Sequence, residues 1–261
     1  MTVNIPDSTL AAMAAAALAC LVIAVVLLFF FKKKGADVLP FFIGCAVFLI
    51  FAAVIEALIN FGVSLTPFGK KMQESAPLLA VYGGLMAGLF EETGRFLAFK
   101  TVLKRRLGNN MNALQYGAGH GSCEAVLTIT VNYISYIVLI LIARTGVLEK
   151  LFSAENIEAL SPIFKAIEDT ENWMFGLALL ERIVAITLHV ALSVLVWFAA
   201  KKNEKLWLFP LAILLHAGVD CAAVLCSRQF AFSALATEGV IAALTAIVVI
   251  IAVIVWKRNK D

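Results

Sequence analysis

Acidic and histidine side chains occur inside four strongly apolar stretches of this 261-residue chain. An ionisable group in the hydrocarbon of a membrane costs a few kcal/mol, about 3 on insertion scales, so such groups are rare and usually functional. Carboxylates and imidazoles from several helices are the groups that form metal sites and acid–base centres. The sequence therefore predicts a buried site of one of these kinds. Its candidate residues are Glu91, Glu92, Arg95, His120, Glu124, Glu181, Arg182, His189, His216 and Asp220.

The composition is that of an integral membrane protein. Hydrophobic residues make up 62% of the chain and charged residues 15%, whereas soluble domains are roughly 45–50% apolar and about 25% charged. The net charge is +3, and the basic residues stand in short clusters between apolar runs. Clusters of this kind indicate on which side of the membrane a loop lies. We therefore expect a multi-pass protein of the cell membrane whose surroundings are the lipid bilayer and which has no nucleic-acid partner.

Seven stretches are long and apolar enough to cross a bilayer, which takes about 20 residues. The first lacks a small-residue cleavage site and is too long for a signal-peptide core, so it counts as a span. The predicted fold class is all-α, a polytopic membrane helix bundle. Because the sequence shows no internal repeat, we expect residues 1–261 to form a single membrane domain. The predicted spans are 9–31, 38–63, 77–103, 112–142, 173–200, 206–227 and 239–256.

Basic clusters indicate the orientation of these spans. All of the strong clusters fall on one side of a seven-span arrangement, and lysine and arginine mark the cytoplasmic side. The N-terminus is thus predicted outside and the C-terminus in the cytoplasm, with the acidic loop of residues 143–172 outside. Ser153 and Ser161 in this loop have the positions of residues that start short helices. The clusters are Lys32-Lys33-Lys34, Lys104-Arg105-Arg106, Lys201-Lys202 with Lys205, and Lys257-Arg258 with Lys260.

The polar residues lie at a common depth in this arrangement. At a rise of about 1.5 Å per residue, four of them lie about 15–18 Å from the cytoplasmic edge, near the middle of a core about 30 Å thick. Random placement would scatter them, so the agreement favours a shared site. The four are Glu92, Glu124, His189 and His216.

Helical spacing adds detail to the acidic pair. Arg95 follows Glu92 by three residues and Glu91 by four, so it can pair with either carboxylate. Glu91 and Glu92 diverge by about 100° around the helix. One can face the site while the other pairs with Arg95, and the sequence leaves open which does so. Pairs four residues apart share a face, as in His120 with Glu124 and His216 with Asp220.

Other residues of these spans are expected to serve the structure. Small residues allow helices to approach closely or to break locally, and one of these roles is expected of Gly117, Gly119 and Gly121, and of Gly83, Gly84 and Gly88. Glu56 and Arg182 lie at a similar, more external depth, so one could neutralise the other.

These motifs resemble those of the YhfC family of membrane peptidases and, more remotely, of PrsW and the CAAX-prenyl-protease and bacteriocin-processing superfamily. The resemblance covers about residues 83–220, with four motifs in the expected order. Two residues, not three, separate Glu92 from Arg95, and Glu124 stands where the prenyl-protease branch has histidine; both features are closer to PrsW. A prenylated substrate is therefore not expected. The motifs are Glu91-Glu92-Thr-Gly-Arg95, His120-Gly-Ser-Cys-Glu124, His189 preceded by Glu181-Arg182, and His216-Ala-Gly-Val-Asp220.

The resemblance implies an intramembrane protease, of glutamic or metallo type, that cleaves membrane-embedded proteins or peptides. In the metallo form, Zn²⁺ would be held by Glu124, His189 and His216, with an open position for water. In the other form, Asp220 would orient His216 and the histidines would stabilise the oxyanion. The residues with catalytic roles would be Glu91, Glu92, Arg95, His120 and Asp220.

Two other classes of protein fit the same residues. A proton- or metal-coupled transporter also places acids and histidines at mid-membrane, although the two halves of the chain lack an inverted repeat. A catalytically inactive membrane scaffold would tolerate alanine at these positions.

Overall fold

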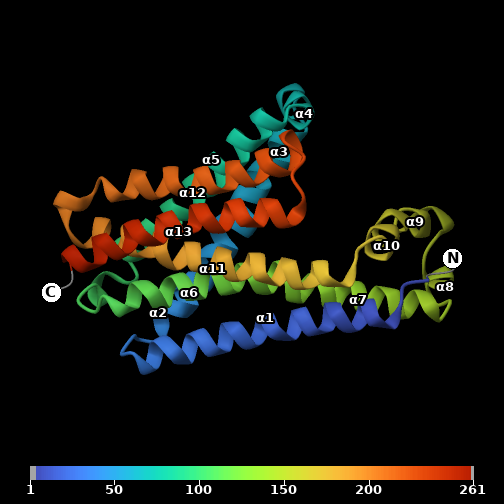
Figure 1. Ribbon diagram of the computed structural model, residues 1–261, viewed down its shortest axis with the longest axis horizontal. Helices are drawn as coiled ribbons and strands as arrows, with labels where there is room; N and C mark the ends of the chain where they lie inside the picture. The colour runs from blue at the N-terminus through green and yellow to red at the C-terminus, as the bar shows by residue number, and fades with distance from the viewer. Residues whose placement is uncertain (1–3, 260–261) are drawn as a thin grey trace. The chain divides into compact units, whose positions relative to one another are not determined.

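The computed structural model describes residues 4–259, apart from the side chains of residues 149, 151 and 154 (Figure 1). Within that range the chain is helical and contains no strand, so the all-α prediction is confirmed. Six segments are long and apolar enough to cross a membrane, which fits a multi-pass membrane protein. They are Asp7–Lys33, Leu39–Ser64, Met111–Arg144, Asn172–Lys201, Asn203–Gln229 and Ala234–Asn259.

Each of the six coincides with a predicted span to within a few residues. The remaining predicted span corresponds to helix α5, Ala76–Lys100, which is 25 residues long but carries Glu91, Glu92 and Arg95. Polar residues lower its hydropathy, and it is not among the six. The count of seven spans and the orientation of the termini therefore stay predictions, and Lys260 of the last basic cluster lies outside the described residues.

The start of α5 is determined locally by its sequence. The short helix α4, Pro67–Glu74, precedes it and is capped by Thr66, whose hydroxyl accepts a hydrogen bond from the Gly69 N–H at 3.1 Å. Ser75 then caps α5 by accepting a 3.4 Å hydrogen bond from the Leu78 N–H. Such caps satisfy N–H groups that have no partner inside the helix. The sequence reading did not anticipate α4, which is too short to show a clear periodicity.

Three of the long segments contain a π-helical stretch. η1, Phe48–Glu56, lies between α2 (Leu39–Val47) and α3 (Ala57–Ser64), and η3, Val126–Val131, lies between α6 (Met111–Ala125) and α7 (Asn132–Arg144). The third, η5 (Leu225–Gln229), follows α12 (Leu208–Val224). Each π turn rotates the residues after it relative to a regular α-helix, and such turns are frequent at functional sites.

Contacts group the chain into two compact units. The described part of unit 1 comprises residues 4–23 and 125–182, including helices α8 (Leu148–Leu151), α9 (Ala154–Glu158) and α10 (Ser161–Glu168). Ser153 caps α9 as predicted, whereas α10 begins at Ser161 itself and follows Leu160, which makes no capping hydrogen bond with its side chain. The Thr9 hydroxyl bonds Asn172 at 3.0 Å, joining the first and last helices of the unit. Arg182 pairs with its neighbour Glu181. A single domain over the whole chain stays a prediction.

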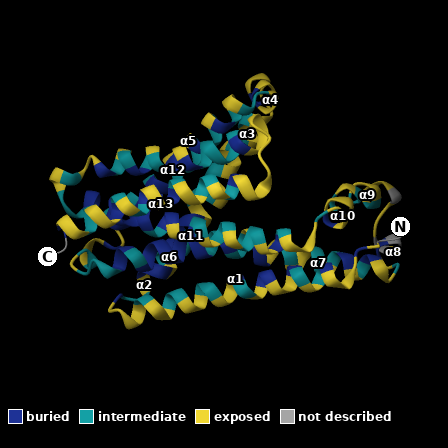
Figure 2. Ribbon diagram, in the orientation of Figure 1, coloured by how far each residue is buried: buried dark blue, intermediate teal, exposed yellow. Residues whose placement is uncertain are grey.

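The described part of unit 2 comprises residues 24–124 and 183–259 and contains all of the predicted site's candidate residues except Glu181 and Arg182, which lie in unit 1. Its core is built around α11, Asn172–Lys201, whose residues 191–200 are all buried and appear dark blue in Figure 2. The Trp197 and Phe99 rings pack edge to face with 4.9 Å between their centroids, and the Phe99 and Tyr116 ring centroids are 4.6 Å apart. These contacts fix α5, α6 and α11 relative to one another. Helix α13, Ala234–Asn259, packs against α12 in the same unit.

Glycines bring the helices that carry the site close together, as predicted. A Cβ atom at Gly117 would lie 2.6 Å from Cα of Val190 in α11, and one at Gly88 would lie 2.6 Å from the Ile213 carbonyl oxygen in α12. Gly83 differs from the others, since a Cβ there would have nothing within 4 Å. Helices α5 and α12 run side by side along much of their length (Figure 1).

Candidate metal centre

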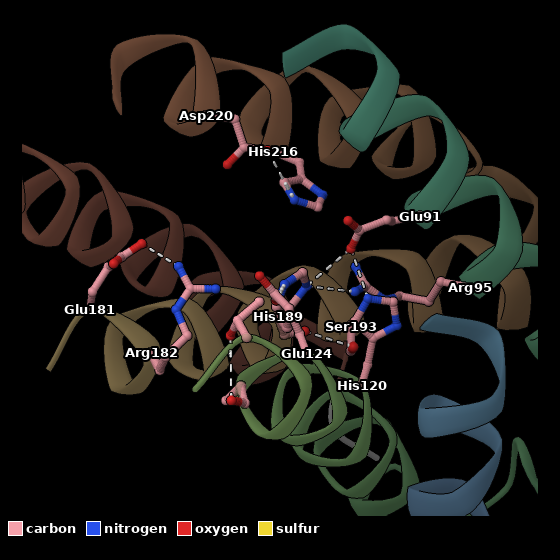
Figure 3. A network of polar contacts seen from close by, with 12 residues as sticks. Glu91, Arg95, His120, Glu124, Glu181, Arg182, His189, Ser193, His216 and Asp220 are labelled. Atoms are coloured by element: carbon pink, nitrogen blue, oxygen red, sulfur yellow. Dashed lines mark hydrogen bonds and ion pairs between the residues drawn. The ribbon is translucent and has the colours of Figure 1, made fainter. Parts of the chain in front are cut away.

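The eight residues to which we assigned catalytic or metal-binding roles lie together in unit 2, and Figure 3 labels all of them except Glu92. Most are deeply buried: Glu92, Arg95 and His120 are fully inaccessible, and His189 and His216 are each 3% exposed. Four helices of the unit contribute them. Helix α5 carries Glu91, Glu92 and Arg95, α6 carries His120 and Glu124, α11 carries His189, and α12 carries His216 and Asp220.

Arg95 connects the acidic pair to a histidine. Its Nη1 forms an ion pair with Glu92 Oε2, which confirms the predicted pairing and identifies Glu92 as the partner. Its Nη2 lies 3.1 Å from Nδ1 of His189. A guanidinium can only donate hydrogen bonds, so Nδ1 of His189 must be the acceptor with a lone pair. The other ring nitrogen, Nε2, then carries the hydrogen.

Glu124 accepts that hydrogen. The Nε2 atom of His189 lies 2.8 Å from Glu124 Oε2. The Ser193 hydroxyl, one turn further along α11, donates to the His189 carbonyl oxygen at 2.7 Å. The imidazole of His189 is therefore held with its Nε2–H toward α6 and its Nδ1 lone pair toward Glu91 and Arg95.

Glu92 accepts a hydrogen bond from His216, as Glu124 does from His189. Its Oε1 lies 2.9 Å from Nδ1 of His216, and its other oxygen is occupied by Arg95. Glu92 is an acceptor, so His216 donates from Nδ1, which leaves Nε2 as the nitrogen that can reach another partner. That nitrogen is 3.6 Å from Oδ2 of Asp220, beyond a good hydrogen bond. Glu92 is thus the carboxylate in hydrogen-bond contact with His216, and the orienting role that the sequence reading gave to Asp220 stays a prediction.

Glu91 is the other member of the acidic pair. Its Oε2 lies 2.8 Å from Nε2 of His120 and 3.8 Å from the Nδ1 lone pair of His189. Its side chain is 9% exposed, whereas that of Glu92 is completely buried. The two carboxylates predicted to diverge do so: Glu92 serves Arg95 and His216, and Glu91 faces His120 and His189.

Three of these residues are placed to bind a metal ion. Glu91, His189 and His216 each offer one ligand atom, and these atoms lie within 4.8 Å of one another. One carboxylate and two imidazoles make a known zinc donor set that leaves a fourth position open, so the group is compatible with zinc. The sequence reading named Glu124 as the third ligand; Glu124 instead contacts His189 on the nitrogen that points away from Glu91.

Sequence reasoning missed two polar neighbours of the site. Tyr116 is fully buried, its ring centre lies 5.9 Å from the Arg95 guanidinium, and its hydroxyl has no hydrogen-bond partner within residues 4–259. Ser193 holds the backbone of His189. The signal that could have found them is helical spacing, because Tyr116 precedes His120 by four residues and Ser193 follows His189 by four.

Comparisons with known proteins point to one family. The chain matches the YhfC intramembrane metalloprotease family over residues 18–257. It is 34% identical over 215 residues to the uncharacterized membrane protein YhfC of Bacillus subtilis strain 168, covering 82% of this chain and 83% of that protein. No solved structure matches the chain. The match along nearly the whole sequence shows that the chain belongs to the YhfC intramembrane metalloprotease family.

Proposed function

We propose that the protein hydrolyses peptide bonds of membrane-embedded proteins at a zinc centre held by Glu91, His189 and His216. The observation that supports this most strongly is the buried donor set, because Glu91, His189 and His216 each offer one ligand atom and these atoms lie within 4.8 Å of one another. Nδ1 of His189 lies 3.8 Å from Glu91 Oε2, so an imidazole nitrogen and a carboxylate oxygen can reach the same cation.

Each of the two imidazoles has a carboxylate on one of its nitrogens, and this arrangement favours a metal ion as the bound cation. Glu124 accepts from Nε2 of His189, and Glu92 accepts from Nδ1 of His216. Metal-binding histidines almost always donate their other N–H to a carboxylate, carbonyl or water, which fixes the tautomer and raises the basicity of the ligand. His189 thus presents its Nδ1 lone pair toward Glu91, and His216 keeps Nε2 as the nitrogen that Glu92 does not contact.

When bound, zinc would supply Lewis acidity to a peptide carbonyl and lower the pKa of a water molecule. His120 would hold Glu91 in place through its Nε2 atom, 2.8 Å from Glu91. The His189 nitrogen that would bind the metal now accepts from Arg95. Metal binding would displace that hydrogen bond, and Arg95 would retain Glu92 as its partner.

Asp220 is the acid that we assign to proton transfer from water. Its side chain is 39% exposed, more than those of Glu91, Glu92 and Glu124, and it lies beside the ligating nitrogen of His216. A carboxylate open to water can accept a proton and pass it to the leaving amine. Arg95 is positively charged and fully buried, which suits it to hold the acidic pair during these steps.

The test is cleavage of a co-expressed single-span membrane protein. Wild type should cleave it, and Glu91→Gln, His189→Ala and His216→Ala should each abolish cleavage to a similar degree because residues that act as a unit are not additive. Glu181→Gln is the matched control, since Glu181 pairs with Arg182 and should be dispensable. Full cleavage by Glu91→Gln would contradict the proposal. Metal uptake into vesicles without any cleavage would favour a transporter.

A further inference from the structure

A second polar site lies where two connections of unit 2 meet, the one between α1 (Asp7–Lys33) and α2 and the one between α5 and α6. Arg106 Nη1 lies 2.8 Å from Asp37 Oδ2, and the buried Asn112 amide donates to the same oxygen at 3.0 Å. The Asp37 N–H donates to Asn112 at 2.8 Å, and Asn109 donates to the Gly35 carbonyl at 2.7 Å. These hydrogen bonds and the ion pair therefore hold the two connections together.

These connections border a pocket of about 550 Å³, which we call the Arg105 pocket. Ligand pockets are roughly 300–1,000 Å³, so this volume is large enough for a small polar molecule. The side chains that line it form a polar part and an apolar part. Arg105, Arg106, Asn109 and Asp37 make up the polar part, and Leu39 and Val102 the apolar part.

The charge around the Arg105 pocket is strongly positive. Residues 24–38 and 100–112 contain Lys32, Lys33, Lys34, Lys100, Lys104, Arg105 and Arg106 but a single acid, Asp37. Asp37 lines the pocket and would repel an anion, but its charge is balanced by Arg106. Arg105 is exposed and adds its guanidinium to the lining. The net field therefore favours an anionic ligand.

The apolar part of the lining connects the pocket to the membrane. Leu39 is the first residue of a segment that can cross a bilayer, and it is 41% exposed. Val102, just beyond the end of α5, is 60% exposed. The Arg105 pocket thus lies at the boundary between hydrocarbon and water, where a ligand with both a charged group and an alkyl chain could contact both parts.

We propose that the Arg105 pocket binds the phosphate headgroup of an anionic phospholipid. The planar guanidinium of Arg105 can bind two phosphate oxygens at once, Asn109 can donate a further hydrogen bond, and Leu39 and Val102 contact the start of an acyl chain. Basic pockets beside membrane helices are a recurrent means of anionic headgroup recognition. Because hydrogen bonds hold the two connections together, the pocket is preformed in the absence of lipid. This site is separate from the metal centre and does not depend on proteolysis.

Lipid retention and melting temperature of the purified full-length protein test the proposal. The protein is mixed in detergent with phosphatidylglycerol, with phosphatidylcholine or with inorganic phosphate, and bound lipid is counted by native mass spectrometry. Phosphatidylglycerol should bind and raise the melting temperature, whereas phosphatidylcholine should do neither. Losing a charge-assisted hydrogen bond should weaken phosphatidylglycerol binding about tenfold in Arg105→Gln, and Arg105→Glu should weaken it further.

Arg228→Gln is the matched control, because Arg228 is also exposed but does not line the pocket, so this variant should bind the lipid like wild type. Unchanged binding by Arg105→Gln would overturn the proposal, as would equal binding of phosphatidylcholine. An equal rise in melting temperature with inorganic phosphate alone would also overturn it, since it would indicate a site for the free anion.

Discussion

The roles of the two histidines follow from the groups that touch their second nitrogens. Arg95 can only donate, so it fixes the tautomer of His189, and Glu92 fixes that of His216. The sequence predicted that Glu91 and Glu92 would take different roles but not which role each takes. That choice depends on the angle at which α5 faces α12, and spacing within one helix cannot determine the angle between two.

Replacing Arg95 by alanine should destabilise the protein strongly. The guanidinium is fully buried and is the partner of a fully buried Glu92, so its loss leaves an uncompensated buried charge at a cost of about 3–5 kcal/mol. The measurement is the denaturation midpoint in detergent, with Arg228→Ala as the control for removing an exposed arginine. An unchanged midpoint for Arg95→Ala would mean that Arg95 reaches water instead of Glu92.

Asp37 should contribute stability that is lost in acid. Hydrogen bonds from Arg106 and Asn112 lower the pKa of its carboxyl below the ordinary value, which is about 3.9 for aspartate. A lowered pKa in the folded state means that the contribution is complete above the ordinary pKa and disappears as the pH falls through the lowered one. Melting curves between neutral pH and pH 3 should show a smaller acid-induced loss in Asp37→Asn than in wild type. Equal losses would show that Asp37 has no such role.

At the scale of elements, apolar runs and basic clusters predicted the long helices to within a few residues. The π stretches could not be predicted, because one extra residue per turn barely alters a hydrophobic pattern. η1, for example, lies wholly inside the apolar run from Leu39 to Ser64. The close approach of α5 and α12 was predictable from Gly84 and Gly88, while Gly83 was wrongly grouped with them because sequence alone does not show which face meets a neighbour.

Adjacent glycines of α5 offer a matched test of this packing. A Cβ at Gly84 would collide with the Ala217 carbonyl of α12, whereas one at Gly83 would enter open space. Gly84→Ala should therefore destabilise the protein by about 1–3 kcal/mol through overpacking and weaken metal binding by shifting Glu91 from His216. Gly83→Ala should be neutral or slightly stabilising, since alanine favours helix by up to about 1 kcal/mol. Similar denaturation midpoints for the two variants would be inconsistent with the helix contact.

At the scale of the whole molecule, the seventh span and the orientation remain to be tested. If α5 crosses the membrane, the N-terminus lies outside and the C-terminus inside, in keeping with the basic clusters. A fluorescent protein fused to the C-terminus should then be protected from protease added to spheroplasts, and an N-terminal epitope should be removed. Both termini on one side would indicate six spans and would leave α5 as a helix that does not cross.

Zinc content tests the central claim most directly. Elemental analysis of the purified wild type, grown with zinc and washed, should find about one zinc ion per chain. His189→Ala, His216→Ala and Glu91→Gln should lose it while keeping their helical circular dichroism. Glu124→Gln should bind zinc about 10–100-fold more weakly, and Glu181→Gln should be unaffected. Wild type that takes up no metal on titration, or histidine variants that retain it, would contradict the metal centre and leave a glutamic mechanism.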